Sequence, residues 1–227
     1  MANLGKAENF GALRRGPVRE SYLEQVQRFI KRAMDLLGAS VLLILLAPVF
    51  FWVGLAVKAD GGPVFFGHER VGRGGRRFMC LKFRTMRVDA RDALERHLAE
   101  NPEARREWEV DFKLRNDPRV TPIGLFLRRT SIDELPQLFN VLAGDMSLVG
   151  PRPITAVEME RYGRNIAFYL KRRPGLTGPW QVSGRNETNY EQRVALDTRY
   201  GQKMSIWQDC VILVRTLQVV ISRRGAY

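Results

Sequence analysis

One apolar segment restricts the folds that are open to this chain. Leu36–Val57 runs for 22 residues without a charged side chain. About 20 apolar residues in a helix cross the roughly 30 Å hydrocarbon core of a bilayer, so the segment is long enough to enter a membrane. Pro48 lies near its middle, where it removes a backbone hydrogen bond and clashes with the carbonyl four residues earlier. We therefore expect a helix that is broken at Pro48.

The segment has basic flanks, made up of Arg28, Lys31 and Arg32 before it and Lys58 after it. Basic flanks favour the cytosolic side, so a re-entrant helix at about residues 33–58 that enters and leaves by one face suits both ends. A simple membrane anchor with a tolerated proline is the alternative. A buried helix of a soluble protein is less favoured, because the segment is apolar on every face. Asp35 is expected at headgroup level, paired with Lys31 or Arg32.

The charge of the chain predicts an anionic partner. Its 227 residues include 37 Lys and Arg against 24 Asp and Glu, which gives a formal net charge of +13. The excess is mostly arginine, which favours bidentate contacts with phosphate. Nucleic acid, acidic lipid and phosphorylated substrates all fit such a charge. The two cysteines, Cys80 and Cys210, lack CxxC spacing, which argues against a zinc site or a disulfide framework.

The richest chemistry lies in the segment 128–153. It holds two adjacent carboxylates, two arginines and a proline-rich turn, namely Asp133, Glu134, Arg128, Arg129 and Pro151-Arg152-Pro153. Adjacent carboxylates repel each other unless a metal ion, cations or water surround them. We predict one helix over Ser131–Leu142, begun either by a capping box of Ser131 and Glu134 or by Asp133 as the N-cap. Both acids then lie at a helix N-terminus, which suits a site for a phosphorylated substrate.

The remaining pattern predicts a helix-rich α+β protein with one domain. Residues 1–27 are expected to form a mobile arm and residues 28–227 the domain. Glycines between β-prone runs predict a hairpin with strands Val64–Phe66 and Arg77–Lys82. Further helices are predicted near Tyr22–Arg32, over Asp89–Lys113 with a fresh start at Asn101-Pro102, and over Ala156–Arg173, Glu191–Tyr200 and Ser205–Ser222. Ala156–Arg173 is basic and aromatic, as expected of an amphipathic helix at a membrane interface.

Four motifs follow one another along the chain: KFRTM (Lys82–Met86), DPRVTPIG (Asp117–Gly124), LRRTSIDELPQLFNVLAGDMSLVGPRP (Leu127–Pro153) and RPGLTGPWQVSGR (Arg173–Arg185). In this order they resemble the bacterial sugar transferases, the monotopic phosphoglycosyl transferases. The resemblance covers the chain from about Lys31 to its C-terminus. Within the family, the chain is most similar to enzymes that begin exopolysaccharide synthesis by loading galactose 1-phosphate onto undecaprenyl phosphate. One departure is Ala47-Pro48 at the helix break, where the family often has Ser-Pro.

The resemblance implies a covalent mechanism. Asp133 matches the nucleophile that attacks the β-phosphorus of a UDP-sugar, releases UMP and holds the phosphosugar until undecaprenyl phosphate attacks. Glu134 matches the second acid, and Mg²⁺ is the implied cofactor with Asp133 and Glu134 as its ligands. Phosphate-facing cations are implied at Lys82, Arg84 and Arg152, and we also assign Arg128, Pro151 and Arg185 to the substrate site. By pattern alone, Asp133 could be a plain N-cap, Glu134 a capping residue and Arg128 a solvated or lipid-facing charge.

These expectations place the enzyme at the bacterial inner membrane with its site on the cytosolic face. Membrane lipids are further expected partners, a homodimer is possible in this family, and nucleic acid is not expected as a partner. The same reaction with glucose 1-phosphate is one alternative. Another is a membrane-tethered basic binding protein without catalysis, which the charge alone would permit.

Overall fold

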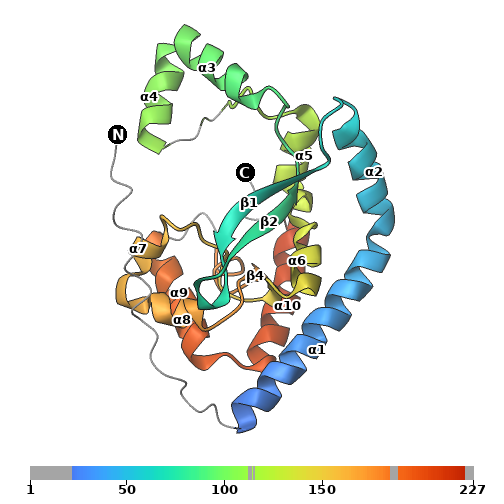
Figure 1. Ribbon diagram of the computed structural model, residues 1–227, viewed down its shortest axis with the longest axis vertical. Coiled ribbons are helices and arrows are strands. Elements are labelled where there is room, and N and C mark those ends of the chain that lie inside the picture. Colours follow the sequence, from blue (N-terminus) through green and yellow to red (C-terminus); the bar gives the residue numbers. More distant parts are fainter. Residues whose placement is uncertain (1–21, 112–113, 115, 185–188, 223–227) are drawn as a thin grey trace.

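The computed structural model describes residues 22–111, 114, 116–184 and 189–222, and these form a helix-rich α+β fold (Figure 1). Its longer elements are α1 (Tyr22–Leu45), α2 (Ala47–Lys58), β1 (Phe65–Val71), β2 (Arg77–Phe83), α3 (Ala90–Glu100), α4 (Pro102–Asp111), α5 (Pro122–Thr130), α6 (Gln137–Ala143), α9 (Tyr190–Lys203) and α10 (Ile206–Ser222). Short elements complete the fold: η2 (Arg73–Gly75), η3 (Ile132–Glu134), β3 (Ser147–Val149), α7 (Met159–Tyr162), η4 (Gly163–Asn165), α8 (Ile166–Leu170) and β4 (Gly175–Thr177). The α+β class predicted from the sequence is confirmed.

The apolar segment folds as two helices, α1 and α2, which run along one edge of the molecule (Figure 1). They meet at Leu46 with a bend of 63°, and Pro48 lies in the first turn of α2, where its missing N–H costs little. The predicted break is therefore confirmed. No single described helix is long and apolar enough to cross a membrane, and α1 and α2 meet that criterion of length and composition only as a bent pair. Residues 22–27, assigned above to the arm, form the start of α1, and the rest of the arm lies outside the described residues.

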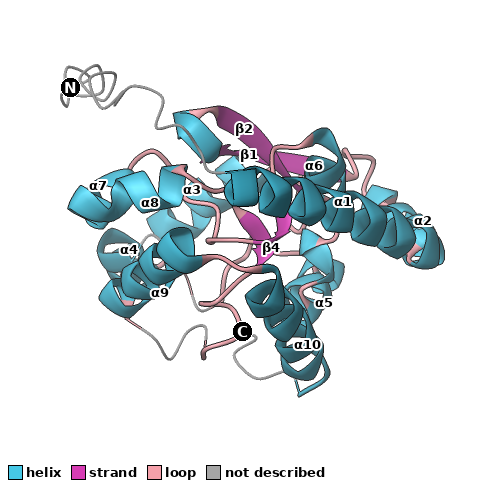
Figure 2. Cartoon of the chain, turned by 90° about the horizontal axis from the view of Figure 1, so that it is seen from below, coloured by secondary structure: helices cyan, strands magenta, loops and turns pink. Residues whose placement is uncertain are grey.

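Buried polar contacts attach α1 to the second sheet. Asp35 is 3 % exposed and accepts hydrogen bonds from Ser147 Oγ at 2.9 Å and from the Leu148 N–H at 3.0 Å. Asp35 therefore packs against the second sheet, and its position at headgroup level stays a prediction. Lys31 Nζ lies 4.0 Å from the Asp35 carboxylate, but its short ion pair, at 2.6 Å, is with Asp209 on α10. The ion pair of Lys31 with Asp209 connects α1 to α10. Figure 2 shows β4 between these two helices.

The predicted hairpin is present, and its strands are longer than expected. β1 and β2 pair antiparallel with Phe66 opposite Lys82. The turn between them needs Gly74 and Gly75, which have φ values of 70° and 82°. The Asn140 side chain on α6 attaches the hairpin to that helix. It accepts a hydrogen bond from the Leu81 N–H at 2.9 Å and donates one to the Met79 carbonyl at 2.8 Å. The strand that carries Lys82 is thereby held against α6.

The second sheet positions the Pro-Arg-Pro turn. β3 and β4 pair in parallel, and the Gly150 N–H donates to the Thr177 carbonyl at 2.9 Å. A Cβ on Gly175 would lie 2.1 Å from the Gly150 nitrogen, so the two backbones approach too closely for any side chain. The Gly175 N–H also donates to the Pro151 carbonyl at 2.8 Å. The proline-rich turn is therefore attached to the core by its backbone.

Two predicted helices are interrupted. The single helix over Ser131–Leu142 is wrong, because Ser131 adopts a left-handed conformation, with φ 57°, that ends α5. A 3-10 turn, η3, follows, and α6 begins only at Gln137. The helix predicted over Ala156–Arg173 is divided into α7, η4 and α8, because Gly163 turns the chain with φ 49° and ψ −130°. The helices predicted around α3, α4, α9 and α10 are confirmed within a few residues.

Candidate active site

The two acids lie in η3, between α5 and α6, where apolar neighbours fix their orientation. Ile132 and Leu135 pack against a core cluster of Val57, Phe83 and Leu127. Asp133 is 7 % exposed, whereas Glu134 is half-buried. In a turn this short, the apolar residues on either side of the dyad point into the core, which directs the carboxylates toward β2. The acids are therefore held by a 3-10 turn and by packing, not by the capping box predicted above.

Lys82 on β2 connects the two carboxylates. Its Nζ lies 3.3 Å from Asp133 Oδ2 and 2.7 Å from Glu134 Oε1. Burial raises the pKa of Asp133, and Glu134 adds to that rise while Lys82 opposes it. Burial alone would lower the pKa of Lys82, but the charges of Glu134 and Asp133 outweigh it and raise that pKa. A carboxylate in this setting is more basic than a solvated aspartate, which makes it a better nucleophile when ionised.

Two of the predicted arginines lie near this trio. Arg128, in the last turn of α5, donates from Nε to Thr85 Oγ1 at 3.0 Å, and its positive charge lowers the pKa of Asp133. Arg152 is half-buried in the Pro-Arg-Pro turn, and its positive charge acts to lower the pKa of Lys82. Its guanidinium carbon lies 5.1 Å from the centroid of the Trp180 ring. The structure thus brings Lys82, Arg128 and Arg152 into one electrostatic environment around the acids.

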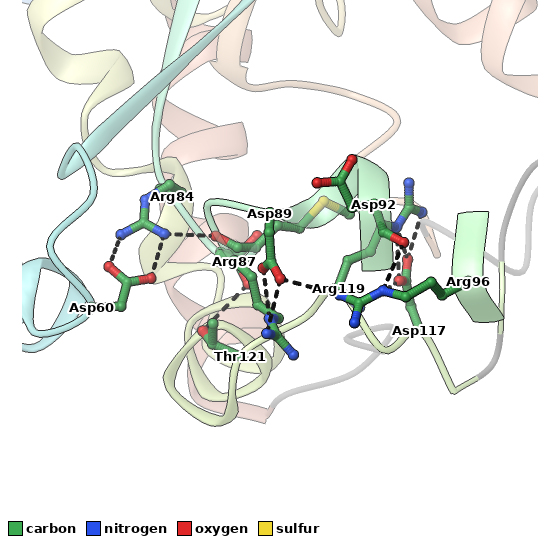
Figure 3. Close-up of polar contacts among 11 residues, drawn as sticks. Asp60, Arg84, Arg87, Asp89, Asp92, Arg96, Asp117, Arg119 and Thr121 are labelled. Atoms are coloured by element: carbon green, nitrogen blue, oxygen red, sulfur yellow. Dashed lines mark hydrogen bonds and ion pairs between the residues drawn. The ribbon is translucent and has the colours of Figure 1, made fainter. Parts of the chain in front are cut away.

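The structure uses Arg84 differently from the prediction. Its guanidinium is buried and faces the end of α2, where it donates to the Val57 carbonyl at 2.9 Å and the Pro63 carbonyl at 2.7 Å. It also forms a bidentate pair with Asp60, visible in Figure 3, and its hydrogen bonds lower the pKa of Asp60 to about 2. These contacts argue against a phosphate-binding role. Although Lys82 and Arg84 are two residues apart, β2 ends between them at Phe83, and the chain turns away.

Other ion pairs shown in Figure 3 lie at the start of α3 and in the turn before α5. Arg119 is paired with Asp117 at 2.6 Å and lies over the Trp108 ring at 4.8 Å. Arg87 is paired with Asp89 at 2.9 Å. These two arginines form ion pairs with neighbouring aspartates and stabilise the local turns. The cation in direct contact with Asp133 and Glu134 is Lys82.

The remaining predicted site residues have simpler outcomes. Pro151 is buried beside Arg152. Arg185 lies outside the described residues. Among the residues that the structure does describe, no three histidine, cysteine or acidic side chains gather into a metal site. Burial raises the pKa of the Cys80 thiol to about 11, so this cysteine is a core residue and no thiolate nucleophile.

Sequence reasoning missed three residues that shape this region, namely Asp60, Glu158 and Arg193. Asp60 neutralises Arg84, and Arg193 pairs with Glu158 at 3.3 Å behind the Pro-Arg-Pro turn. Each of these pairs joins residues more than 20 positions apart. The sequence contained no local signal for these pairs, because only the tertiary fold brings the two partners together.

The chain as a whole is similar to known proteins. The model of the bacterial sugar transferase family matches residues 26–223, and the chain belongs to this family. It is 49 % identical over 210 residues to an undecaprenyl-phosphate galactose phosphotransferase of Salmonella typhimurium, covering 92 % of this chain and 44 % of that protein. It is 50 % identical over 198 residues to the exopolysaccharide production protein ExoY of Rhizobium meliloti, covering 87 % and 88 %.

The chain is also similar to a relative named for glucose. The UDP-glucose:undecaprenyl-phosphate glucose-1-phosphate transferase of Escherichia coli is 39 % identical over 220 residues, which cover 93 % of this chain and 44 % of that protein. The chain thus spans less than half the length of several curated relatives, and most of the length of ExoY. The family expected from the four motifs is confirmed.

Proposed function

We propose that the protein transfers a sugar 1-phosphate from a UDP-sugar to undecaprenyl phosphate and so begins exopolysaccharide synthesis. The observation that carries this proposal is the pair of buried Asp133 and half-buried Glu134, joined by the ammonium of Lys82. The names of relatives include UDP-galactose or UDP-glucose, undecaprenyl phosphate and exopolysaccharide production, and these support the substrates and the pathway proposed here.

In the first half-reaction, an ionised oxygen of Asp133 attacks the β-phosphorus of the UDP-sugar. A bond forms between that oxygen and phosphorus, the bond to the bridging oxygen breaks, and UMP leaves with the electron pair. Burial raises the pKa of Asp133, and Lys82 opposes that rise, which favours the ionised form that attacks. In the second half-reaction, a phosphate oxygen of undecaprenyl phosphate attacks the same phosphorus and releases the carboxylate.

The cations of the site neutralise the substrate phosphates. Lys82 touches both acids, and Arg128 and Arg152 add charges that act on this trio. Two carboxylates alone are a sparse set of protein ligands, but Mg²⁺ is commonly held by one or two carboxylates with substrate phosphates completing the shell. Asp133 and Glu134 fit that pattern. When bound there, Mg²⁺ would offset negative charge on the diphosphate.

The first two helices support a membrane location. They expose large apolar side chains along their length, namely Phe29, Leu37, Ile44, Leu45, Phe51, Trp52 and Leu55. Water does not favour such a surface, and a lipid bilayer does. Helix α10 exposes Trp207, Val214 and Leu217 in the same way, which suits a helix at the membrane interface. We infer that α1 and α2 form a re-entrant helix in the inner membrane, with the dyad on the cytosolic face.

Galactose 1-phosphate is the favoured cargo, because two relatives named for galactose are 49 % and 53 % identical, whereas two relatives named for glucose are 39 % and 41 % identical. Glucose 1-phosphate is the second candidate. A passive basic binding protein is disfavoured, because such a protein gains nothing from two adjacent acids of which one is buried.

The direct test is UMP release by the purified protein with Mg²⁺, undecaprenyl phosphate and a panel of UDP-sugars. We expect the fastest release with UDP-galactose, and none with Asp133→Asn. Asp145→Asn, in the same segment but outside the dyad, is the matched control and should keep wild-type turnover. No release from any UDP-sugar, or full activity in Asp133→Asn, would refute the proposal.

A further inference from the structure

Four contacts connect the Pro-Arg-Pro turn to α9 and α7 through alternating guanidinium groups and aromatic rings. Arg152 lies 5.1 Å from the Trp180 ring centroid, and Arg193 lies 5.3 Å from the same centroid. Arg193 also lies 5.1 Å from the Tyr190 ring, and Arg161 is 4.7 Å from that ring. We call these five residues the arginine–aromatic stack. Its first member is the arginine that the sequence places at the phosphate site.

The middle of the stack is anchored. Arg193 is 7 % exposed, and its Nη1 lies 3.3 Å from Glu158 Oε1. Its Nε lies 4.0 Å from Asp197 Oδ2, which accepts a hydrogen bond from the Tyr162 hydroxyl at 2.7 Å. Among the described residues, Nε and Nη2 of Arg193 have no hydrogen-bond partner. Ring faces and nearby charges therefore hold this guanidinium, and its plane is set by the stack.

Trp180 and Arg152 are also joined through the backbone. Each follows one of the two strands of the parallel sheet, and the glycines before them are in close contact. A Cβ on Gly178 would lie 1.9 Å from the Gly150 carbonyl oxygen. The loop that carries Trp180 and the turn that carries Arg152 therefore have a fixed spacing.

We propose that Trp180 is a positioning residue that orients Arg152 toward the phosphates of the UDP-sugar. The contact of Arg193 with the Trp180 ring keeps that ring in place. This inference rests on the proposed function and extends it to the support behind the reacting groups. An arginine side chain has four rotatable bonds, and an ordered guanidinium binds phosphate better than a mobile one. A ring face on one side restricts those bonds while it leaves the N–H groups at the edge of the guanidinium available for phosphate oxygens.

A double-mutant cycle on UMP release tests the inference, with Trp180→Leu, Arg152→Ala and the two combined. Trp180→Leu should lower kcat/KM about 10- to 100-fold, because it removes the ring face. In the Arg152→Ala background, the same change should alter kcat/KM less than about 2-fold, since there is no guanidinium left to orient. Trp180→Phe keeps a ring face and should stay within about 3-fold of wild type.

Trp108→Leu is the matched control. Trp108 carries Arg119 in a similar contact but takes no part in the stack, so its loss should leave kcat/KM unchanged. Thermal melts of every variant check that the fold is intact. Equal effects of Trp180→Leu with and without Arg152 would overturn the positioning role, and so would wild-type kinetics in Trp180→Leu. Either result would leave the proposed function standing, whereas absence of UMP release from the wild type would refute that function itself.

Discussion

The ammonium of Lys82 lies 3.3 Å from the carboxylate of Asp133, although 51 residues separate them along the chain. This contact joins the first strand pair to the turn between α5 and α6. It also sets the charge balance of the site, because burial raises the pKa of Asp133 while Lys82 lowers it.

Replacing Lys82 tests this balance. In Lys82→Met, the carboxylates of Asp133 and Glu134 lose their shared cation, and we expect kcat to fall about 100-fold. Since Lys82 lowers the pKa of Asp133, its removal should raise that pKa further, and the acidic limb of the pH–rate profile should move to higher pH. Lys82→Arg should recover part of the rate, and Lys203→Met, on the exposed end of α9, is the control. An unshifted acidic limb would contradict this account of the site.

Arg84 should act on stability and not on substrate binding. Arg84→Met leaves Asp60 and the Val57, Pro63 and Met86 carbonyls without their donor. We expect the free energy of unfolding to fall by about 2 to 4 kcal/mol. The KM for the UDP-sugar should remain within about 3-fold of wild type, whereas Arg152→Ala should raise it more than that. Denaturant unfolding and initial-rate kinetics measure the two quantities. A large rise in KM with normal stability in Arg84→Met would restore the original assignment.

Asp197 should make stability depend on pH. Burial raises its pKa from 3.8 to about 6, although the Tyr162 hydroxyl and Arg193 oppose that shift. Between pH 4 and 6 the folded state therefore holds a proton that the unfolded state has released, so this residue destabilises the fold as pH rises through that range. Asp197→Asn removes this effect and keeps an acceptor for Tyr162. Relative to wild type, its free energy of unfolding should rise by up to about 3 kcal/mol from pH 4 to pH 7. Parallel stability curves for the two proteins would rule this out.

The topology of the bent helix pair can be read by labelling. Gln27 and Ala59 are exposed positions on either side of the apolar segment, and each is replaced by cysteine in a separate variant. A re-entrant helix places both on the cytosolic face, so a membrane-impermeant maleimide should label both in inverted vesicles and neither in intact spheroplasts. The parent protein with Cys80 and Cys210 measures background labelling. Labelling of the two positions from opposite sides would establish a spanning helix.

Local patterns accounted for several parts of the molecule. The break near Pro48, the hairpin around Gly74 and Gly75, and the helices before and after Asn101-Pro102 follow from properties of neighbouring residues. Proline and glycine restrict or release the backbone wherever they occur, so their positions can be read directly. The helix over Ser131–Leu142 could not be read correctly, because packing of Ile132 and Leu135 favours a 3-10 turn there.

The sequence by itself determined the family, the adjacent acids and an apolar segment with a break, since each depends on residues close together in the chain. Only the tertiary structure decided which cation of the KFRTM motif forms an ion pair with Asp133 and Glu134. Lys82 and Arg84 are equivalent in the sequence pattern, yet Lys82 reaches Asp133 and Arg84 turns to Asp60. Likewise, only the fold brings Arg193 behind Trp180 and Arg152. The physical reason is that a charge buried on folding must find an opposite charge or a ring face within a few ångströms, and packing alone determines which distant residue provides it.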